Sequence, residues 1–478
     1  MDEGVSETET KSWIDVAGVI RWGAQPPTGI QRVETTICKR ALETGAADFA
    51  IFDVIGSRYR PLSRRERAFF NYIIEGQWPS DTAPHAERLK SAFAYLDIQL
   101  SHPDNETARR LAFALSGFRR RSGIAYALAK YGLRIMQFFM LLFSFLRTRL
   151  GAMAGKLAGA SERWAPEGAV VLVSHEVNRD RFIDRGLAHA GLRGVHIVHD
   201  LIPVLMPELV TSRFHAGMNG FLRRILAKPE PIISVSHATR DDLVAWNRDV
   251  VKAPYPFAVK VCPLGAALVS TEGESERIPD LPERSYAVFC STFDIRKNQH
   301  LLVSVWAELV RFLGPERVPD LLLIGRPGNS SSLVKEELEK APHIADKVHI
   351  RSGISDKQLR WAYRNALIGL FPSSAEGWGL GVSECLANGL PVVHADVPAL
   401  REAAQNLMPV LPAGDFEAWK TTLQDLFEHP EKVAELRADV ARDYDRSTPD
   451  GFAGCVLSYL GFLARDGFDA AKPGGNPA

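Results

Sequence analysis

The chain has 478 residues, which is too many for one ordinary hydrophobic core and indicates two or three domains. Hydrophobic residues make up 46% of the chain and charged residues 24%, as in ordinary soluble globular proteins. The formal net charge is zero, so we expect no overall attraction to nucleic acid.

The five cysteines are an odd number, lie far apart and include no C-x-x-C pair. This pattern argues against a disulfide framework or a zinc finger and fits a reducing compartment. The first residues, MDEGVSETETKSW, are acidic and polar, whereas a signal peptide would be basic and then apolar. We therefore expect a cytoplasmic protein.

Residues 13–20 predict a first strand, followed by a Pro/Gly loop and the helical pattern IQRVETTICKRALE. Such a junction can present backbone amides near Gly29, together with the side chain of Arg32, to an anionic or sugar ligand. A single glycine-bearing turn is also compatible with a simple loop and a solvated arginine.

The alternating pattern stops at about residue 57 and resumes at about residue 168, which indicates an insertion. Residues 107–161 contain ten Lys or Arg and no acidic residue. The apolar run at 135–146 has only twelve residues, whereas a bilayer span needs roughly 20. We favour a basic amphipathic helix lying on an anionic membrane surface, and the alternative is a helix packed on the protein's own core.

From residue 168 strands alternate with helices, which predicts a parallel, doubly wound sheet. His175 follows one apolar strand, and His199 and Asp200 follow the next. Ligands collect at the carboxyl ends of such strands. A histidine in this position is also often structural or a helix cap.

Residues 271–285 are polar, contain two prolines and show no apolar period, which indicates an interdomain linker. The linker divides the chain into segments that we expect as follows: an N-terminal Rossmann-like domain at 1–270 with a helical insertion at 57–167, a C-terminal Rossmann-like domain at 286–445, a helix at 446–465 that returns to the N-terminal domain, and a disordered tail at 466–478.

Arg296 and Lys297 lie where a loop turns into a helix, and paired cations there can hold a diphosphate. A basic pair at a helix start opposes the helix dipole, which favours a binding role over that of an exposed structural pair. Arg326 lies in the loop after the next strand and is a further candidate for donor binding.

Residues 371–384, FPSSAEGWGLGVSE, join a buried strand to a helix. Three glycines allow backbone amides at the helix start to approach an anion: Gly377, Gly379 and Gly381. Glu376 falls in the loop and Glu384 inside the helix, so a ligand with phosphates and hydroxyls would satisfy all these groups. The alternative is a tight glycine turn with two solvated glutamates.

Several motifs together resemble the retaining glycosyltransferases of family 4, which have the GT-B architecture of two Rossmann-like lobes facing a cleft. The resemblance rests on Glu376 and Glu384 with seven residues between them, and on the segments PTGIQRVE, VHDLIPVLMPEL, SVSHATRDDL, STFDIRKNQHLL and GISDKQLRWAYRNA. These motifs cover about residues 13–55 and 168–410 and leave the basic insertion unexplained.

The resemblance implies that Glu376 contacts sugar hydroxyls of the donor and that Glu384 holds the nucleotide ribose. It implies a catalytic part for His175, which would steady the developing oxocarbenium ion. The diphosphate would meet Arg296, Lys297 and the backbone of Gly377, Trp378, Gly379, Leu380 and Gly381. Many members carry an arginine where Thr292 stands here, which leaves Arg296 as the substitute.

The chemistry that the resemblance implies is electrostatic stabilisation of a leaving nucleoside diphosphate, with no metal and no protein nucleophile. Asp443 and Asp445 have the D-x-D spacing of some metal sites, but no apolar strand precedes them, so no metal is expected. The expected partners are a nucleotide-sugar donor, with GDP-mannose first, and a glycan or lipid-linked acceptor in surface polysaccharide assembly. The alternatives are a sugar-nucleotide epimerase, a phosphorylase and a catalytically silent nucleotide-sugar-binding protein.

Overall fold

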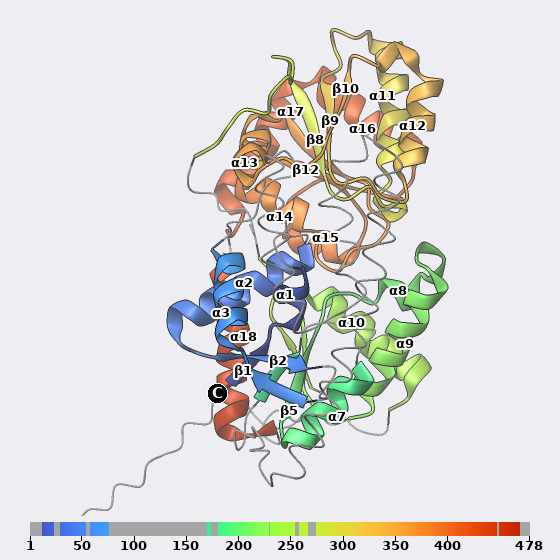
Figure 1. Cartoon of the computed structure of the whole chain (residues 1–478). Helices are drawn as coiled ribbons and strands as arrows, with labels where there is room; N and C mark the ends of the chain where they lie inside the picture. The colour runs from blue at the N-terminus through green and yellow to red at the C-terminus, as the bar shows by residue number, and fades with distance from the viewer. Residues whose placement is uncertain are drawn as a thin grey trace, which may run out of the picture.

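The computed structural model contains two α/β lobes, one stacked on the other (Figure 1). It describes residues 12–22, 29–53, 58–75, 170–173, 180–228, 230–253, 258–265, 274–446 and 449–468. The expected α/β class with two parallel, doubly wound sheets is confirmed. Of the insertion expected at 57–167, residues 58–75 are described, and 58–61 form a strand of the N-terminal sheet, not part of a helical insertion. The basic segment at 107–161 and both interpretations of it lie outside the described residues.

The N-terminal lobe is built on a seven-stranded sheet in the order β3-β2-β1-β4-β5-β6-β7. Its edge strand β3 pairs antiparallel with β2, and the other pairs are parallel. The strands are β1 (Ser12–Asp15), β2 (Asp48–Asp53), β3 (Arg58–Pro61), β4 (Val170–Val173), β5 (Arg193–Val198), β6 (Ile232–Ser234) and β7 (Val259–Val261). Strands β1 and β4 are buried throughout, as expected where helices cover both faces of a parallel sheet.

The helices described in this lobe are α1 (Ala17–Trp22), α2 (Gly29–Thr44), α3 (Arg64–Ile74), α7 (Asp180–Ala190), α8 (Ile202–Leu205), α9 (Ser212–Leu226) and α10 (His237–Trp246), with short turns η2 (Pro207–Leu209) and η3 (Asn247–Val251). Ser236 is the N-cap of α10, and its side chain accepts a hydrogen bond from the backbone of Thr239. Serine is a preferred N-cap residue because its side-chain oxygen can accept a hydrogen bond from a backbone N–H group of the first turn.

The C-terminal lobe is built on a six-stranded, fully parallel sheet in the order β10-β9-β8-β11-β12-β13. The strands are β8 (Tyr286–Cys290), β9 (Asp320–Ile324), β10 (Val348–Arg351), β11 (Ile368–Phe371), β12 (Val392–Ala395) and β13 (Val410–Leu411). The strand order reverses between β8 and β11. The loops that leave these two strands therefore diverge to opposite faces and open a crevice at their carboxyl ends.

The helices of this lobe are α11 (Gln299–Leu313), α12 (Ser331–Lys340), α13 (Asp356–Asn365), α14 (Leu380–Ala387), α15 (Pro398–Ala403), α16 (Phe416–Glu428) and α17 (Pro430–Asp443), with turns η4 (Ile295–Lys297) and η5 (Pro342–Ile344). Part of the linker packs on this lobe, since the backbone N–H of Glu276 donates to the carbonyl of Lys357 in α13 at 3.2 Å.

The last helix, α18 (Pro449–Asp466), returns to the N-terminal lobe and packs against α2, β1 and β4 (Figure 1). A disulfide joins Cys455 of this helix to Cys262, which follows β7. The expectation from cysteine spacing is therefore wrong for this pair. The two residues are 193 positions apart in the chain, and only the return of α18 brings them together.

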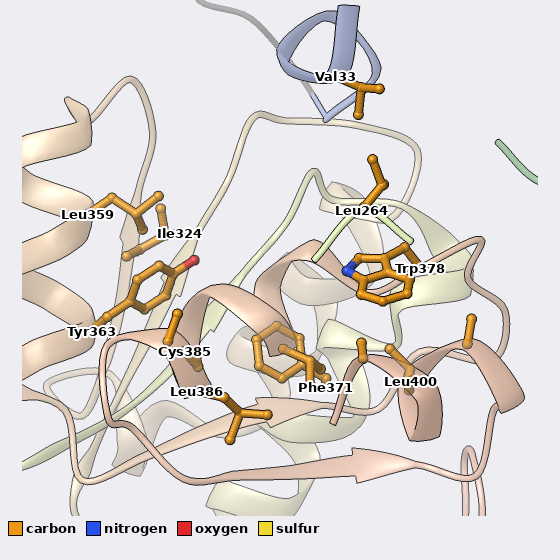
Figure 2. Packing of buried hydrophobic residues seen from close by; sticks show 14 of the residues in the cluster. Val33, Leu264, Ile324, Leu359, Tyr363, Phe371, Trp378, Cys385, Leu386 and Leu400 are labelled. Atoms are coloured by element: carbon orange, nitrogen blue, oxygen red, sulfur yellow. The ribbon is translucent and has the colours of Figure 1, made fainter. Parts of the chain in front are cut away.

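One hydrophobic core cluster extends across both lobes. Figure 2 shows Val33 of α2 and Leu264 of the N-terminal lobe on the same side of the view, above Trp378 of the C-terminal lobe. Apolar contact thus holds the lobes together next to the crevice. Among the described residues, no helix is both long and apolar enough to span a lipid bilayer.

Candidate active site

A cleft of about 550 Å³ lies between the carboxyl ends of the two sheets. Fourteen sequence-predicted site residues line it: Gly29, Arg32, His199 and Asp200 from the N-terminal lobe, and Arg296, Lys297, Arg326, Glu376, Gly377, Trp378, Gly379, Leu380, Gly381 and Glu384 from the C-terminal lobe. His175 lies outside the described residues. The predicted loops therefore meet at one place, and the cleft is large enough for a small organic ligand.

Two cations and a carboxylate meet at the crevice of the C-terminal sheet. Nη1 of Arg296 lies 3.0 Å from Oε2 of Glu376, and Nζ of Lys297 donates to Oε1 of the same residue. The Arg296 guanidinium also donates to the carbonyl of Ala375 at 2.7 Å. Glu376 is only 10% exposed, so the interpretation of it as a solvated glutamate is wrong.

Local structure explains why these cations face the crevice. Asp294 caps the η4 turn, and Asn298 ends it in the left-handed region at φ 53°. The Asn298 side chain donates to the carbonyl of Pro372 at 2.8 Å. This bond joins the loop after β8 to the loop after β11, so both basic side chains point toward Glu376 rather than into solvent.

The electrostatics of the cluster keep Glu376 ionised. Burial raises the pKa of Glu376, but Lys297 and Arg296 more than offset this effect and lower the pKa to about 2. Burial lowers the pKa of Lys297, and the facing carboxylate opposes that shift. Burial raises the pKa of Asp200, across the cleft, and Arg296 opposes the rise. An incoming phosphate would therefore share two cations that Glu376 already partly neutralises.

Steric contacts within the protein, and not only the approach of a ligand, explain the glycines of this loop. A Cβ atom on Gly377 would lie 2.1 Å from the carbonyl oxygen of His199 in the other lobe. A Cβ atom on Gly381 would lie 2.4 Å from the ring of Phe371, and Gly379 has φ 111°. Glycine is thus required at Gly377 because the two lobes touch there, which the sequence does not indicate.

Trp378 is a packing residue of the same loop. Its indole is 7% exposed, and Nε1 lies 3.1 Å from the carbonyl of Gly265 and 3.2 Å from Oγ of Ser383. Figure 2 shows the indole near Leu264 and Leu400. The side chain therefore anchors the start of α14 on the N-terminal lobe.

Glu384 lies on α14 and is 6% exposed, so it is not solvated. Its Oε2 accepts a hydrogen bond of 3.0 Å from the hydroxyl of Tyr363 on α13. Burial raises the pKa of Glu384, and the positive charge of Arg32 from the other lobe opposes the rise. Arg32 itself pairs with Asp356 at 2.5 Å and its side chain is 20% exposed, so it is not a fully solvated arginine.

Sequence reasoning misses two polar groups, one that lines the cleft and one that is buried behind Glu384. Cys290 ends β8 and lines the cleft, and burial raises the pKa of its thiol to about 12, so it stays neutral. Tyr363 lies within the helical motif of the family resemblance, but nothing in that motif marks it as the partner of Glu384. Only the packing of α13 beside α14 brings the two together.

Comparison with known proteins gives a family match for the C-terminal part of the chain. Residues 272–442 match the family described as glycosyl transferases group 1. The chain is 28% identical over 228 residues to the serotype-specific mannosyltransferase WbdA of Escherichia coli, a match that covers 45% of this chain and 27% of that protein. It is 21% identical over 253 residues to the O-antigen chain mannosyltransferase RfbU of Salmonella typhimurium, covering 52% of this chain and 65% of that protein.

The matched region thus spans about a quarter of WbdA and about two thirds of RfbU. Among solved structures, Anabaena HepE in complex with UDP and glucose has a similar fold, with a TM-score of 0.54 and 13% identity. That match covers 94% of this chain and 98% of HepE, so it includes both lobes and the cleft between them. The chain has the two-lobed GT-B fold, and residues 272–442 within its C-terminal part match the group 1 glycosyl transferase family model.

Proposed function

We propose that this chain is a retaining glycosyltransferase that moves a sugar from a nucleoside-diphosphate donor to a glycan or lipid-linked acceptor. The observation that carries the proposal is the partly buried cluster of Arg296, Lys297 and Glu376 that lines a two-lobed cleft. Two partly buried cations beside one carboxylate suit a ligand that brings further negative charge together with hydroxyl groups.

In the proposed arrangement the donor lies along the crevice of the C-terminal sheet. The diphosphate lies between the two cations and the first turn of α14, whose backbone N–H groups carry the positive end of the helix dipole. Oε2 of Glu384 accepts from the Tyr363 hydroxyl, which orients the carboxylate and leaves Oε1 to accept hydrogen bonds from the ribose. Glu376 faces the transferred sugar and accepts from its hydroxyl groups.

The reaction breaks the bond between the anomeric carbon and the phosphate oxygen and forms a bond from that carbon to the acceptor oxygen. The acceptor's proton goes to an oxygen of the departing diphosphate. Arg296 and Lys297 stabilise the charge that develops on the leaving group, and the contact of the lobes at Gly377 excludes water. We propose that His175 steadies the positive charge at the anomeric carbon. No step in this scheme uses a divalent metal, so activity should survive chelation by EDTA.

GDP-mannose is the first donor to test because the named relatives are mannosyltransferases. Thermal-shift measurements with GDP, UDP and dTDP and their sugars test the donor site, since a ligand of the folded state raises the melting temperature. A ligand at 100 times its Kd should add about 2.7 kcal/mol to the free energy of unfolding. If none of these nucleotides shifts the melting temperature, the donor-site assignment is wrong.

We also propose that residues 107–161 bind the inner face of the cytoplasmic membrane, where a lipid-linked acceptor would lie. Ten basic residues and no acidic residue in this segment support electrostatic attraction to anionic lipid. The protein should sediment with vesicles that contain anionic lipid and not with neutral vesicles. Equal sedimentation after deletion of 107–161 would contradict this part of the proposal.

A further inference from the structure

The first turn of α10 in the N-terminal lobe is capped by a residue of the C-terminal lobe. Glu402 of α15 accepts hydrogen bonds from the backbone N–H groups of His237, at 2.9 Å, and Ala238, at 3.1 Å. The N–H groups of a first helical turn have no partner within the helix, and the helix dipole favours a negative charge beside them. A residue of the other lobe thus satisfies two of these donors.

The same end of α10 also holds the donor loop. The hydroxyl groups of Ser236 and Thr239 lie 2.7 Å and 3.2 Å from the carbonyl oxygen of Gly377. Gly377 directly follows Glu376, and its backbone is in close contact with the carbonyl of His199. The beginning of α10 is therefore a docking point that receives both α15 and the loop of Glu376.

The contact made by Glu402 differs from an ion pair that also links the lobes. Arg32 and Asp356 also join them, but the Asp356 side chain is 56% exposed, and such exposed pairs are worth roughly 0–1 kcal/mol. Both oxygens of Glu402 accept from fixed backbone donors, so the bond is charge-assisted, and its geometry holds only while the lobes are together.

We propose that Glu402 is a positioning residue: by docking on the start of α10 it holds the lobes closed and fixes the Gly377 carbonyl beside Ser236 and Thr239. Opening the lobes would release the carbonyl and leave the His237 and Ala238 N–H groups to water. Glu376 would then lose the fixed backbone that aims it at the donor. Glu402 acts through the loop and does not touch the ligand.

The kinetic consequence rests on the proposed glycosyl transfer, whereas the effect on lobe closure does not. Glu402→Gln keeps one acceptor oxygen but loses the charge and one of the two hydrogen bonds. With the first donor that supports turnover, kcat should fall about tenfold to a hundredfold, in line with the loss of charge-assisted hydrogen bonds. The Kd for the nucleoside diphosphate should change less than about threefold, since its proposed ligands lie within the C-terminal lobe.

Small-angle scattering with saturating nucleoside diphosphate gives the readout that is independent of activity. The radius of gyration of Glu402→Gln should exceed that of the wild-type protein. Glu431→Gln is the matched control, because Glu431 lies at the N-terminal end of a helix, α17, as Glu402 lies beside that of α10, but Glu431 is exposed and belongs to the first turn of its own helix. It should match the wild-type protein in kcat and in radius of gyration.

Ser236→Ala tests the other half of the docking point. It should also lower kcat, and its effect combined with Glu402→Gln should be less than additive if both act through lobe closure. Wild-type kcat and radius of gyration in Glu402→Gln would overturn the proposal. So would a lower melting temperature with unchanged kcat, which would make Glu402 a helix cap only. If no donor turns over, the radius of gyration alone tests whether Glu402 holds the lobes closed. A failure of the Glu402 proposal is therefore distinguishable from a failure of the proposed glycosyl transfer.

Discussion

Arg296 donates from Nη1 to Oε2 of Glu376 over 3.0 Å, although the two residues are 80 positions apart and lie in different loops. The loops leave β8 and β11, which are neighbours at the point where the strand order of the C-terminal sheet reverses. The topology therefore brings a cation and a carboxylate together. Glu376 is thus the counterion of both Arg296 and Lys297, the two cations that we propose bind the donor's diphosphate.

Glu376 should make the free energy of unfolding depend on pH. Its folded-state pKa of about 2 lies below the ordinary value of 4.5, so the ionised carboxylate stabilises the fold above pH 4.5. This contribution is lost as the pH falls from about 4.5 toward 2, and about 1.4 kcal/mol of it should be gone at pH 3.5. Urea unfolding of the wild-type protein and Glu376→Gln between pH 6 and 3.5 measures the difference. If the free energy of unfolding falls equally with pH in the wild-type protein and in Glu376→Gln, the pairing of Glu376 with Arg296 and Lys297 is contradicted.

Arg32 should set the acid limb of donor binding through Glu384. Burial raises the pKa of Glu384 and Arg32 opposes the rise, so Arg32→Ala should raise that pKa further. Glu384 would then protonate at a higher pH. As the pH is lowered, the Kd of the nucleoside diphosphate should therefore begin to rise at a higher pH than in the wild-type protein. Asp356→Asn tests the opposite direction, because the Asp356 charge raises the pKa of Glu384, so its loss should move the limb to lower pH.

The Tyr363 hydroxyl should stabilise the fold and orient Glu384. Tyr363→Phe leaves a buried carboxylate oxygen without its 3.0 Å donor, which costs about 1–3 kcal/mol in the free energy of unfolding. The variant should also bind a nucleoside diphosphate more weakly than the wild-type protein, while a ribose-free pyrophosphate probe should bind equally well. Equal loss for both probes would mean that Glu384 does not contact the ribose.

The sequence predicts the alternation of strands and helices, the two lobes and the glycine loop because these depend on local periodicity and turn residues. It also places Arg296, Lys297 and Glu376 at the ends of strands that a parallel sheet brings together. It does not reveal that Tyr363 faces Glu384 or that Glu402 caps α10. Those contacts depend on how helices of different segments pack, and no local pattern records such packing.

For the same reason, the spacing of the cysteines does not predict the disulfide between Cys262 and Cys455. This disulfide leads to a further prediction. Because it closes a long loop, its reduction should lower the free energy of unfolding by about 2–5 kcal/mol. Denaturant unfolding with and without dithiothreitol measures the loss. Cys455→Ser is the control and should be as stable as the reduced wild-type protein and insensitive to the reductant. Equal stability of the wild-type protein in both conditions would contradict a structural disulfide.

The most direct test of the account is the release of a nucleoside diphosphate together with a glycosylated acceptor, followed by mass spectrometry, with NMR of the anomeric centre of the product. The wild-type protein should retain the anomeric configuration of the donor. Lys297→Ala and Glu376→Gln should each lower kcat/KM by about 10²–10³-fold, the loss typical when a group that stabilises transition-state charge is removed. Lys432→Ala, which removes an exposed ion pair with Asp425, should behave as the wild-type protein does. Turnover that survives in Lys297→Ala, or a product of inverted configuration, would contradict the account.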